Sequence, residues 1–336
     1  MSKFLIPFTK MHALGNDFVV VSSVDLRATQ CGSRLLKGWQ NFAPQLARAL
    51  CDRNRGVGGD GLILVIEHEL TGKLERSIEG LPPYKGSETA DIGWIYTNSD
   101  GSSSDMCGNG LRCVALFAVE RRLVSDHNFT LATAAGVMSV DYQSAHAITV
   151  DMGKPELVPE RIPVVARNSE RFVGEPIVIT ENGSDRPLSA TCVNMGNPHC
   201  VIFGEEYDGA AYRDARLDSL ARQIQSNRIF PQGVNVEFVG DIAPAYARVL
   251  VWERGCGPTL ACASGAAAVL VAGVLAGKLE RTATIELPGG QLKAQWSGED
   301  DHVRLTGSAT EVFNGQIDLL HFSSLHGLLA AEATCT

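Results

Sequence analysis

The sequence predicts an α+β protein of two homologous lobes, each made of short β-strands around one buried helix. Short segments of alternating or β-branched apolar residues fill most of the chain, and convincing helical patterns are few. The two clearest helical stretches, residues 111–122 and 265–280, are apolar on nearly every face, which is typical of a helix in the middle of a lobe. Both stretches belong to an internal repeat, which predicts two lobes related by a pseudo-twofold axis.

The strand predictions follow from short apolar runs bounded by turn residues. The clearest runs are residues 17–23, 62–66, 94–98, 234–239 and 248–254. Residues 69–92 stand between two of these strands and contain Pro82, Pro83 and several glycines and charged residues. We therefore expect an exposed insertion at this place.

The repeat runs through both halves in the same order. Asn98 stands nine positions before Cys107, and Glu253 stands nine positions before Cys262, in each case at the end of a predicted strand. The other repeated segments are a Gly-Asn turn with its strand (14–21 and 195–203), a strand ending in glycine (129–136 and 282–290) and a closing segment (151–153 and 305–307). We expect an N-terminal lobe of residues 1–151 and a C-terminal lobe of residues 152–308, with the two cysteines facing each other across a cleft.

Composition limits the class of partner. A length of 336 residues with 45% hydrophobic content predicts a folded chain of two ordinary domains rather than disorder. A net charge of -9 without clustered Lys or Arg argues against nucleic acid or an anionic membrane surface, so we expect a small-molecule partner. No stretch is long and apolar enough for a signal peptide or a bilayer span. Nine scattered cysteines do not suggest a secreted disulfide framework, so we expect a reducing, cytoplasmic location.

A cysteine stands at the start of each buried helix. Backbone N–H groups and the helix macrodipole favour negative charge there, which lowers a thiol pKa from its usual value of about 8.5. Small residues at Gly108, Gly110, Ala263 and Gly265 allow a ligand close to these donors, which would stabilise a carbanion next to a carboxylate. A thiolate on one face of the α-carbon and a thiol on the other would invert its configuration. The pattern predicts a two-base racemase or epimerase without a cofactor.

Two alternatives concern the cysteines. A single Cys at a helix start is more often a packing residue, but its recurrence in a matched frame favours chemistry. Six cysteines without such a partner are interpreted as packing or surface residues: Cys31, Cys51, Cys113, Cys192, Cys200 and Cys335. Zinc could instead be bound by the C-x5-C pairs Cys107–Cys113 and Cys256–Cys262 with His199. The spacing exceeds the usual ligand gap, so we expect no metal.

The segment GVGGDG at residues 56–61 matches the spelling of a dinucleotide-binding loop. Such a loop follows a strand and opens a helix, whereas this segment follows charged residues and opens a predicted strand. We interpret its glycines as a tight turn and expect no nucleotide cofactor.

The sequence resembles the diaminopimelate epimerases, which interconvert LL- and meso-diaminopimelate in lysine and peptidoglycan-precursor synthesis without pyridoxal phosphate. The resemblance covers residues 8 to about 319. Its carriers are KMHALGNDFVVV, DRNRGVGGDGLILV, NSDGSSSDMCGNGLRC, MGNPHCVIF, GVNVEFV and ERGCGPTLACASGA, in the family's order. Proline racemases and hydroxyproline epimerases resemble MCGHG at the first cysteine, so Asn109 favours the diaminopimelate branch.

The resemblance implies the roles of individual residues. Cys107 and Cys262 would be the acid/base pair, and backbone groups near Gly108, Asn109, Ala263 and Ser264 would hold the reacting carboxylate. The substrate-binding side chains would be Asn16, Asn98, Asn197, Asn235, Glu253 and Arg254. His199 could support the reacting amine or be structural. The resemblance also implies mostly antiparallel sheets around each central helix, a last strand near 309–320 that returns to the first lobe, and a homodimer.

Three positions depart from the family pattern. Gly61 stands where some members carry a substrate-contacting Gln, Pro258 replaces a commoner acidic residue, and Ala263 replaces the usual Gly. Cys256 is also unusual and could be a redox liability. The insertion at 69–92 and the tail from about 320 to 336 lie outside the resemblance. A zinc-binding module and a non-catalytic amino-acid-binding protein remain as alternatives of other classes.

Overall fold

A computed structural model describes residues 4–67, 90–103, 106–166, 170–181 and 183–326. The chain divides into two compact units, and each is described by itself. Unit 1 contains the residues up to Ile148 and those from Ser308 onward, and unit 2 is Thr149–Gly307. The predicted α+β class is confirmed. None of the helices in the described ranges is long and apolar enough to cross a membrane.

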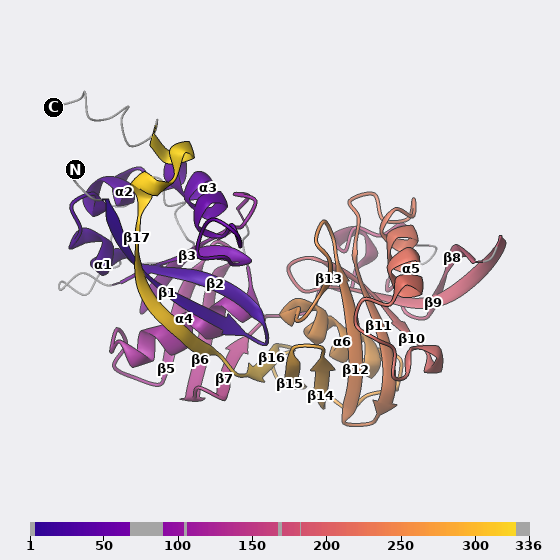
Figure 1. The fold of residues 1–336 in the computed structure, drawn as a ribbon. Coiled ribbons are helices and arrows are strands. Elements are labelled where there is room, and N and C mark those ends of the chain that lie inside the picture. Colours follow the sequence, from indigo (N-terminus) through magenta and orange to yellow (C-terminus); the bar gives the residue numbers. More distant parts are fainter. Residues whose placement is uncertain (1–3, 68–89, 104–105, 167–169, 182, 327–336) are drawn as a thin grey trace. The chain divides into compact units, whose positions relative to one another are not determined.

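Unit 1 combines one mixed sheet with a central helix and a group of outer helices (Figure 1). Its strands are β1 (Leu5–Ala13), β2 (Asn16–Ser22), β3 (Gly61–Ile66), β4 (Ile92–Asn98), β5 (Asn128–Thr133), β6 (Gly136–Ser144) and β17 (Thr310–Asp318). Its helices are α1 (Ser23–Arg27), α2 (Gly32–Lys37), α3 (Trp39–Leu50), α4 (Gly108–Glu120) and the 3-10 turn η4 (Leu319–His321). Strand β7 (Ala147–Asp151) contains the boundary between the units.

Unit 2 has the same kinds of element. Its strands are β8 (Glu175–Glu181), β9 (Ser184–Asn194), β10 (Pro198–Phe203), β11 (Asn235–Ala243), β12 (Tyr246–Glu253), β13 (Gly257–Thr259), β14 (Thr282–Leu287), β15 (Gly290–Trp296) and β16 (Val303–Gly307). Its helices are α5 (Ala215–Gln225) and α6 (Ala263–Leu275), with 3-10 turns η2 (Pro159–Arg161) and η3 (Glu205–Tyr207).

The strand pairing is the same in both units. In unit 1 the order β17–β1–β2–β3–β4–β5–β6 contains parallel pairs at β2–β3 and β4–β5, and the other pairs are antiparallel. In unit 2 the order β8–β9–β10–β11–β12–β14–β15 contains parallel pairs at β10–β11 and β12–β14, at the same places. A repeat found in sequence is therefore also a repeat of hydrogen-bonded topology.

The repeat extends to a small feature beside each cysteine. In unit 2 the strand β13 folds back on β12, pairing Trp252 with Pro258. In unit 1 an isolated antiparallel bridge joins Thr97 to Ser103, which are the positions 155 residues earlier. Both turns bring the chain from the end of a strand to a cysteine at the start of a helix.

The two central helices are buried, as their composition predicts. Helix α4 packs against β1, β2, β6 and β17, and α6 packs against β9, β10, β11, β12, β14, β15 and β16. Both begin two or three residues earlier than the predicted stretches because each preceding cysteine caps the helix. Arg112 on α4 is a charged residue with 0% exposure inside this otherwise apolar environment.

The outer helices were not predicted from the sequence. Helix α3 places Trp39, Phe42, Leu46 and Leu50 at spacings of three and four residues, and this face fills the core between α3 and β3. Helix α5 does the same in unit 2 with Leu217, Leu220, Ala221 and Ile224. The three- and four-residue spacing of these apolar residues is present in the sequence, so both helices have a local sequence signal.

The two segments outside the family resemblance are partly described. Most of the predicted insertion, residues 68–89, lies outside the described residues. Beyond it, Ala90 and Ile92 are buried, and Ile92 begins β4. After β17, Leu319 and Leu325 are both buried in the core of unit 1, so this part of the chain after the last strand contributes to packing.

Candidate active site

The two cysteines of the repeat occupy the same local geometry. Cys107 is the N-cap of α4 with φ -149° and ψ 102°, and its Sγ accepts a hydrogen bond from the backbone N–H of Gly110 at 3.4 Å. Cys262 is the N-cap of α6 with φ -128° and ψ 111°, and its Sγ accepts from the backbone N–H of Gly265 at 3.3 Å. A sulfur in the capping position lies at the positive end of the helix dipole, which stabilises a thiolate.

Glycines three residues after each cysteine are required by packing. A Cβ at Gly110 would lie 2.7 Å from the ring of Trp94, and a Cβ at Gly265 would lie 3.0 Å from Oε1 of Glu237 and 3.3 Å from Sγ of Cys262. A Cβ at these positions would press on Trp94 in unit 1 and on Glu237 and the cysteine sulfur in unit 2. The glycines therefore allow the thiol to approach the helix N–H groups closely.

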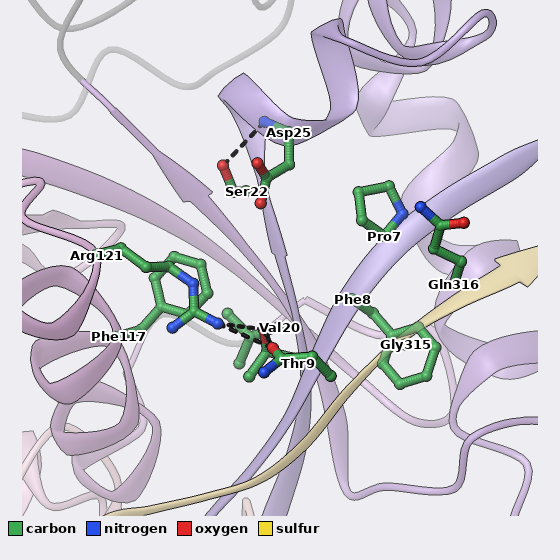
Figure 2. A pocket seen from close by; sticks show the side chains of 11 residues that line it. Pro7, Phe8, Thr9, Val20, Ser22, Asp25, Phe117, Arg121, Gly315 and Gln316 are labelled. Atoms are coloured by element: carbon green, nitrogen blue, oxygen red, sulfur yellow. Dashed lines mark hydrogen bonds between the residues drawn. The ribbon is translucent and has the colours of Figure 1, made fainter.

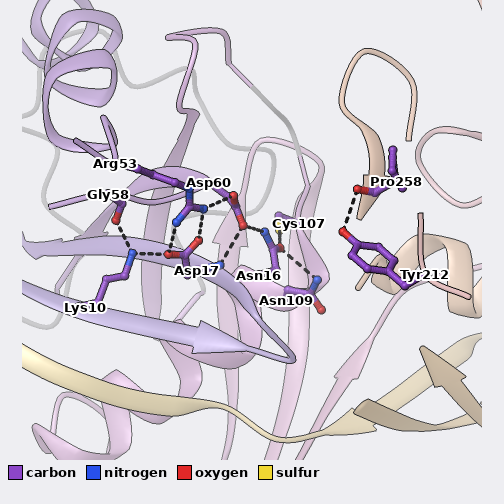
Figure 3. A network of polar contacts seen from close by, with 10 residues as sticks. All are labelled: Lys10, Asn16, Asp17, Arg53, Gly58, Asp60, Cys107, Asn109, Tyr212 and Pro258. Carbon is purple, nitrogen blue, oxygen red and sulfur yellow. Dashed lines mark hydrogen bonds and ion pairs between the residues drawn. The ribbon is translucent and has the colours of Figure 1, made fainter. Parts of the chain in front are cut away.

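Around Cys107, three predicted residues form one hydrogen-bonded group (Figure 3). Asn16 donates through Nδ2 to Oδ2 of Asp60 at 2.6 Å, which directs its Oδ1 toward Cys107 Sγ at 3.8 Å and Asn109 Nδ2 at 3.1 Å. Asn109 in turn accepts from the guanidinium of Arg112 at 2.6 Å. The amide of Asn16 is thus fixed by a carboxylate on one side and faces the thiol on the other.

A cluster of alternating charges supports this group. Asp17 lies between Lys10 on β1 and Arg53, which also pairs with Asp60 at 2.8 Å. Burial alone would raise the pKa of Asp17, but the hydrogen bonds and charges of Arg53 and Lys10 lower it to about 2. The two carboxylates of this cluster balance its two cationic side chains. The cluster therefore holds Asn16 in place without adding a net charge beside Cys107.

Cys262 has a different electrostatic environment. Its side chain is 5% exposed, and its Sγ lies 3.4 Å from the hydroxyl of Ser264. Burial raises the pKa of this thiol well above its usual value, and the carboxylates of Glu253 and Glu237 raise it further. The two capping cysteines therefore share a backbone geometry but not a charge environment.

The polar residues predicted in unit 2 gather at one end of its strands. Glu253 ends β12, and its Oε1 accepts from the hydroxyl of Thr259 at 2.6 Å. Asn235 begins β11 beside His199 and accepts through Oδ1 from the backbone N–H of Arg254 at 2.8 Å. The hydrogen bonds of Thr259 and Arg254 hold the Glu253 carboxylate and the Asn235 amide in place at this end of the sheet.

His199 on β10 lies opposite Asn235 on β11 and is completely buried. Its Nδ1 lies 2.6 Å from Oε1 of Glu237, and its Nε2 lies 2.8 Å from Oδ1 of Asn197. Both ring nitrogens are therefore occupied by protein partners. This arrangement makes His199 a support for Asn197 rather than a contact for a bound molecule.

Gly61 occupies in unit 1 the position that Asn235 occupies in unit 2. Gly61 begins β3, pairs with Phe18 on β2 and with Asn98 on β4, and Asn98 ends its strand as Glu253 does. A Cβ at Gly61 would lie 2.3 Å from the ring of Tyr96. The ring of Tyr96 fills the space that a side chain at position 61 would occupy. The packing of unit 1 therefore accounts for the glycine at this departure from the family pattern.

The structure brings the predicted residues together in two groups, one in each unit. In unit 1 these are Asn16, Cys107, Gly108 and Asn109, while Asn98 bonds instead to Ser102 through both its backbone N–H and its side chain. In unit 2 they are Asn197 with His199, Asn235 with Glu253 and Arg254, and Cys262 with Ala263 and Ser264. At Pro258, the carbonyl accepts from the hydroxyl of Tyr212 at 3.1 Å.

Two residues beside the cysteines were missed by the sequence reasoning, Arg112 and Glu237. Each carries a charge at a position that the surrounding apolar pattern places inside the fold, and each is 0% exposed. A charged residue within an otherwise apolar helix or strand was the available signal, because such a residue needs a specific polar environment.

The structure bears on two other interpretations of the sequence motifs, a nucleotide-binding loop at residues 56–61 and a zinc site. Gly58 has φ +80°, and residues 56–61 form a turn that leads from α3 into β3, not into a helix. Within the described ranges, no group of three or more His, Cys, Asp or Glu side chains has a geometry suited to a metal ion. Cys31, Cys51, Cys113, Cys192 and Cys200 are buried, and Cys256 is exposed.

A cavity of about 540 Å³ lies elsewhere on unit 1 (Figure 2). It is lined by parts of β1, β2, α1, α4 and β17 and by Arg121, whose guanidinium donates to Thr9 and Asn314, each at 2.9 Å. None of the residues predicted to bind substrate lines it. This cavity is therefore separate from the cysteine group.

Comparison with known proteins decides the family. The profile of the diaminopimelate epimerase family matches residues 8–158 and 191–312. The diaminopimelate epimerase of Acaryochloris marina is 40% identical over 92% of this chain and 98% of its own length. The chain belongs to the diaminopimelate epimerase family. Another member, from Heliobacterium modesticaldum, is 38% identical over 93% of this chain and 99% of its own length.

Solved structures with the same fold include more distant proteins. A hydroxyproline epimerase from Agrobacterium vitis superimposes with a TM-score of 0.62 at 16% identity, covering 94% of this chain and 93% of that one. A probable proline racemase from Agrobacterium radiobacter gives a TM-score of 0.60 at 16% identity, covering 95% of both chains. At these identities the likeness shows the fold alone, which this member of the diaminopimelate epimerase family shares with them.

Proposed function

We propose that this protein is a cofactor-independent epimerase that converts LL-diaminopimelate to meso-diaminopimelate by a two-base mechanism. Membership of the diaminopimelate epimerase family supports the substrate and its place in lysine and peptidoglycan-precursor synthesis. The observation that carries the mechanism is the matched pair of capping cysteines, Cys107 on α4 and Cys262 on α6.

The proposed reaction moves one proton off the α-carbon and another one on. A thiolate removes the α-hydrogen as a proton, which leaves the electron pair of the C–H bond on the carbon and in the adjacent carboxylate. The thiol of the other cysteine then donates its proton to the opposite face of the carbon. After one turnover the thiol and thiolate have exchanged places, and no electron has been gained or lost.

The helix ends would stabilise the intermediate. In each helix the backbone N–H of the third residue is bonded to the cysteine sulfur. The first two N–H groups of each helix are those of Gly108 and Asn109 on α4 and of Ala263 and Ser264 on α6, at the positive end of the helix dipole. We assign them to the reacting carboxylate, where extra negative charge develops in the transition state.

The remaining polar groups suit a substrate that carries an ammonium and a carboxylate at each end. We assign Asn98, Asn197, Asn235, Glu253 and Arg254 to these charged groups, because amides, one acid and one guanidinium match them in hydrogen-bonding character. Asn16 and His199 have supporting roles in this scheme. Asn16 orients the thiol of Cys107, and His199 orients Asn197.

Incubation of the purified protein with LL-diaminopimelate in deuterated water tests the function. We expect meso-diaminopimelate that carries deuterium at the inverted α-carbon, detected by NMR and mass spectrometry, and we expect the reaction to continue in EDTA. Binding without exchange would indicate an amino-acid-binding protein, and loss of folding in the chelator would indicate a zinc module. Either result would contradict the proposal.

We further propose a cytoplasmic homodimer, on the basis of family resemblance and the composition of the chain. Light scattering coupled to size-exclusion chromatography measures the mass in solution. A monomeric mass at micromolar concentration, with full activity, would contradict the dimer.

A further inference from the structure

Arg112 is a buried cation whose contacts are all neutral. It is 0% exposed, and its guanidinium donates to the carbonyl of Gly108 at 3.3 Å, to Oδ1 of Asn109 at 2.6 Å and to the carbonyl of Ser308 at 3.4 Å. Among the described residues, no carboxylate lies within ion-pair distance of it. Burial of a charge without a counter-ion is costly, so a residue of this kind needs a reason beyond packing.

The guanidinium keeps its charge at neutral pH and lies in the electrostatic range of Cys107. Burial lowers the pKa of Arg112 to about 10, and negative charge on Cys113 or Cys107 would raise it. Cys113 is fully buried in the apolar interior, which raises the pKa of its thiol far above the usual value and leaves it protonated. Cys107 is therefore the nearby group that can supply the missing negative charge.

Among the residues that the structure describes, the other charged groups near Cys107 do not replace Arg112. Asp17, Asp60, Lys10 and Arg53, from β1, β2 and the turn before β3, form the balanced cluster described above. Asn16 places a neutral oxygen beside the thiol, which favours the protonated form. The positive charge of Arg112 opposes this preference from the interior side of the helix, through Asn109.

The equivalent position on α6 carries no cation. The position 155 residues after Arg112 is Ala267, on the first turns of α6. Cys262 instead has the carboxylates of Glu237 and Glu253 nearby, and both disfavour its thiolate. Within the described ranges, two thiols with the same capping geometry thus have buried charges of opposite sign beside them.

We propose that Arg112 is the positioning residue that stabilises the thiolate of Cys107, so that Cys107 is ionised before Cys262 in the unliganded protein. The proposal rests on the two-cysteine function proposed above and deepens it, because it assigns the resting protonation states. In that reaction the first proton transfer needs a thiolate in one unit, and the second needs a thiol in the other.

The test is the pH dependence of alkylation of each cysteine in the absence of substrate. The protein is treated briefly with iodoacetamide between pH 5 and 10, and modification of Cys107 and Cys262 is quantified separately by peptide mass spectrometry. In the wild-type protein we expect Cys107 to react at lower pH than Cys262. Because the thiolate is the reactive form, the midpoint of each profile reports ionisation, whereas the plateau at high pH reports access.

Charge-removing and charge-conserving variants separate electrostatics from structure. We expect Arg112→Met to move the Cys107 midpoint upward by about one pH unit, which is about a tenfold slower reaction at neutral pH, and to leave the Cys262 midpoint unchanged. Arg112→Lys should restore most of the wild-type profile. Arg121→Met removes a partly exposed charge from the C-cap of the same helix, and we expect it to have no effect on Cys107.

Several outcomes would overturn the proposal. These are an unchanged Cys107 midpoint in Arg112→Met, an equal shift in Arg121→Met, or earlier alkylation of Cys262 than of Cys107 in the wild-type protein. The last comparison needs no variant and remains decisive if Arg112→Met does not fold. The proposed function fails separately, if the wild-type protein does not place deuterium on the α-carbon.

The complementary charge can be tested in unit 2. Glu237 is buried beside the first turn of α6, and its carboxylate opposes the ionisation of Cys262. We expect Glu237→Gln to move the Cys262 midpoint to lower pH without moving that of Cys107, with the exposed Glu299→Gln as control. A Cys262 midpoint unchanged by Glu237→Gln would remove the charge asymmetry from which the proposal is argued.

Discussion

At the scale of single residues, the side chain of each capping cysteine does two things. Its sulfur accepts a hydrogen bond from the helix, as a serine oxygen would, and it is the atom proposed to carry the proton. These two tasks can be separated by substitution, because Ser is a good N-cap residue but a much weaker acid than Cys.

We expect Cys107→Ser and Cys262→Ser each to lower the rate of epimerisation by at least about a thousandfold, because each removes one of the two groups that transfer the proton. The melting temperature should stay within a few degrees of the wild-type value, since the cap is kept. Circular dichroism and the deuterium assay measure the two properties. Normal turnover by either variant would refute the role of that cysteine.

A second residue-scale prediction concerns Asp17. Its folded-state pKa of about 2 lies below the usual value, so its ion pairs stabilise the fold above about pH 4 and this contribution disappears as the pH falls toward 2. We expect Asp17→Asn to lower the free energy of unfolding by about 1–2 kcal/mol at pH 7, after allowance for solvent screening, and to have little effect near pH 2. Urea unfolding at both values measures this, and an equal loss at the two pH values would contradict it.

At the scale of elements, the positions where strands end decide which side chains reach the cysteines. Asn98 and Glu253 both end a strand nine residues before a capping cysteine, and a short turn joins each strand end to its helix. Because the turn has the same length in both units, the polar residue at the strand end has the same position relative to the cysteine in each unit. Gly61 and Asn235 show how the same position can differ when a neighbour such as Tyr96 takes the space.

We expect Gly61→Ala to destabilise the fold by about 1–3 kcal/mol, because its Cβ would lie 2.3 Å from the Tyr96 ring inside the sheet. Gly298→Ala is the matched control, since no atom lies within 4 Å of the position of its Cβ. Thermal unfolding compares the two variants. Equal stability of both would show that Tyr96 moves away without cost.

At the scale of the whole molecule, unit 1 is formed by two separate segments of the chain, one on each side of unit 2 in the sequence. Strand β17, from the end of the chain, pairs with β1 along nearly its whole length, whereas the equivalent strand of unit 2, β8, directly precedes its partner β9. Leu319 and Leu325, which follow β17, complete the same core. Unit 1 therefore depends on residues that are synthesised after unit 2.

A chain that ends at Gly307 tests this dependence. We expect the amides of β1 to lose their protection from hydrogen exchange, because both the paired strand and part of the core are removed, while the amides of β9 to β12 keep theirs. The full-length chain is the reference for both regions. Protection of β1 equal to that of the full-length chain would show that the unit is stable without its last strand.

The sequence by itself determined the features that depend on local pattern. Two apolar helices, the cysteine that begins each of them, the strands before and after and the order of the repeat could all be predicted, because period, composition and capping are properties of neighbouring residues. The amphipathic helices α3 and α5 belonged to the same class of signal and were overlooked.

Only the tertiary structure decided the environment of the two cysteines. Arg112 meets the carbonyl of Ser308, 196 positions away, and Glu237 meets His199, 38 positions away. The local apolar pattern indicates that these charges are buried, but their partners come from distant parts of the chain, so no local pattern specifies the partners. This is why the repeat predicts two equivalent thiols, and the packed units make them electrostatically different.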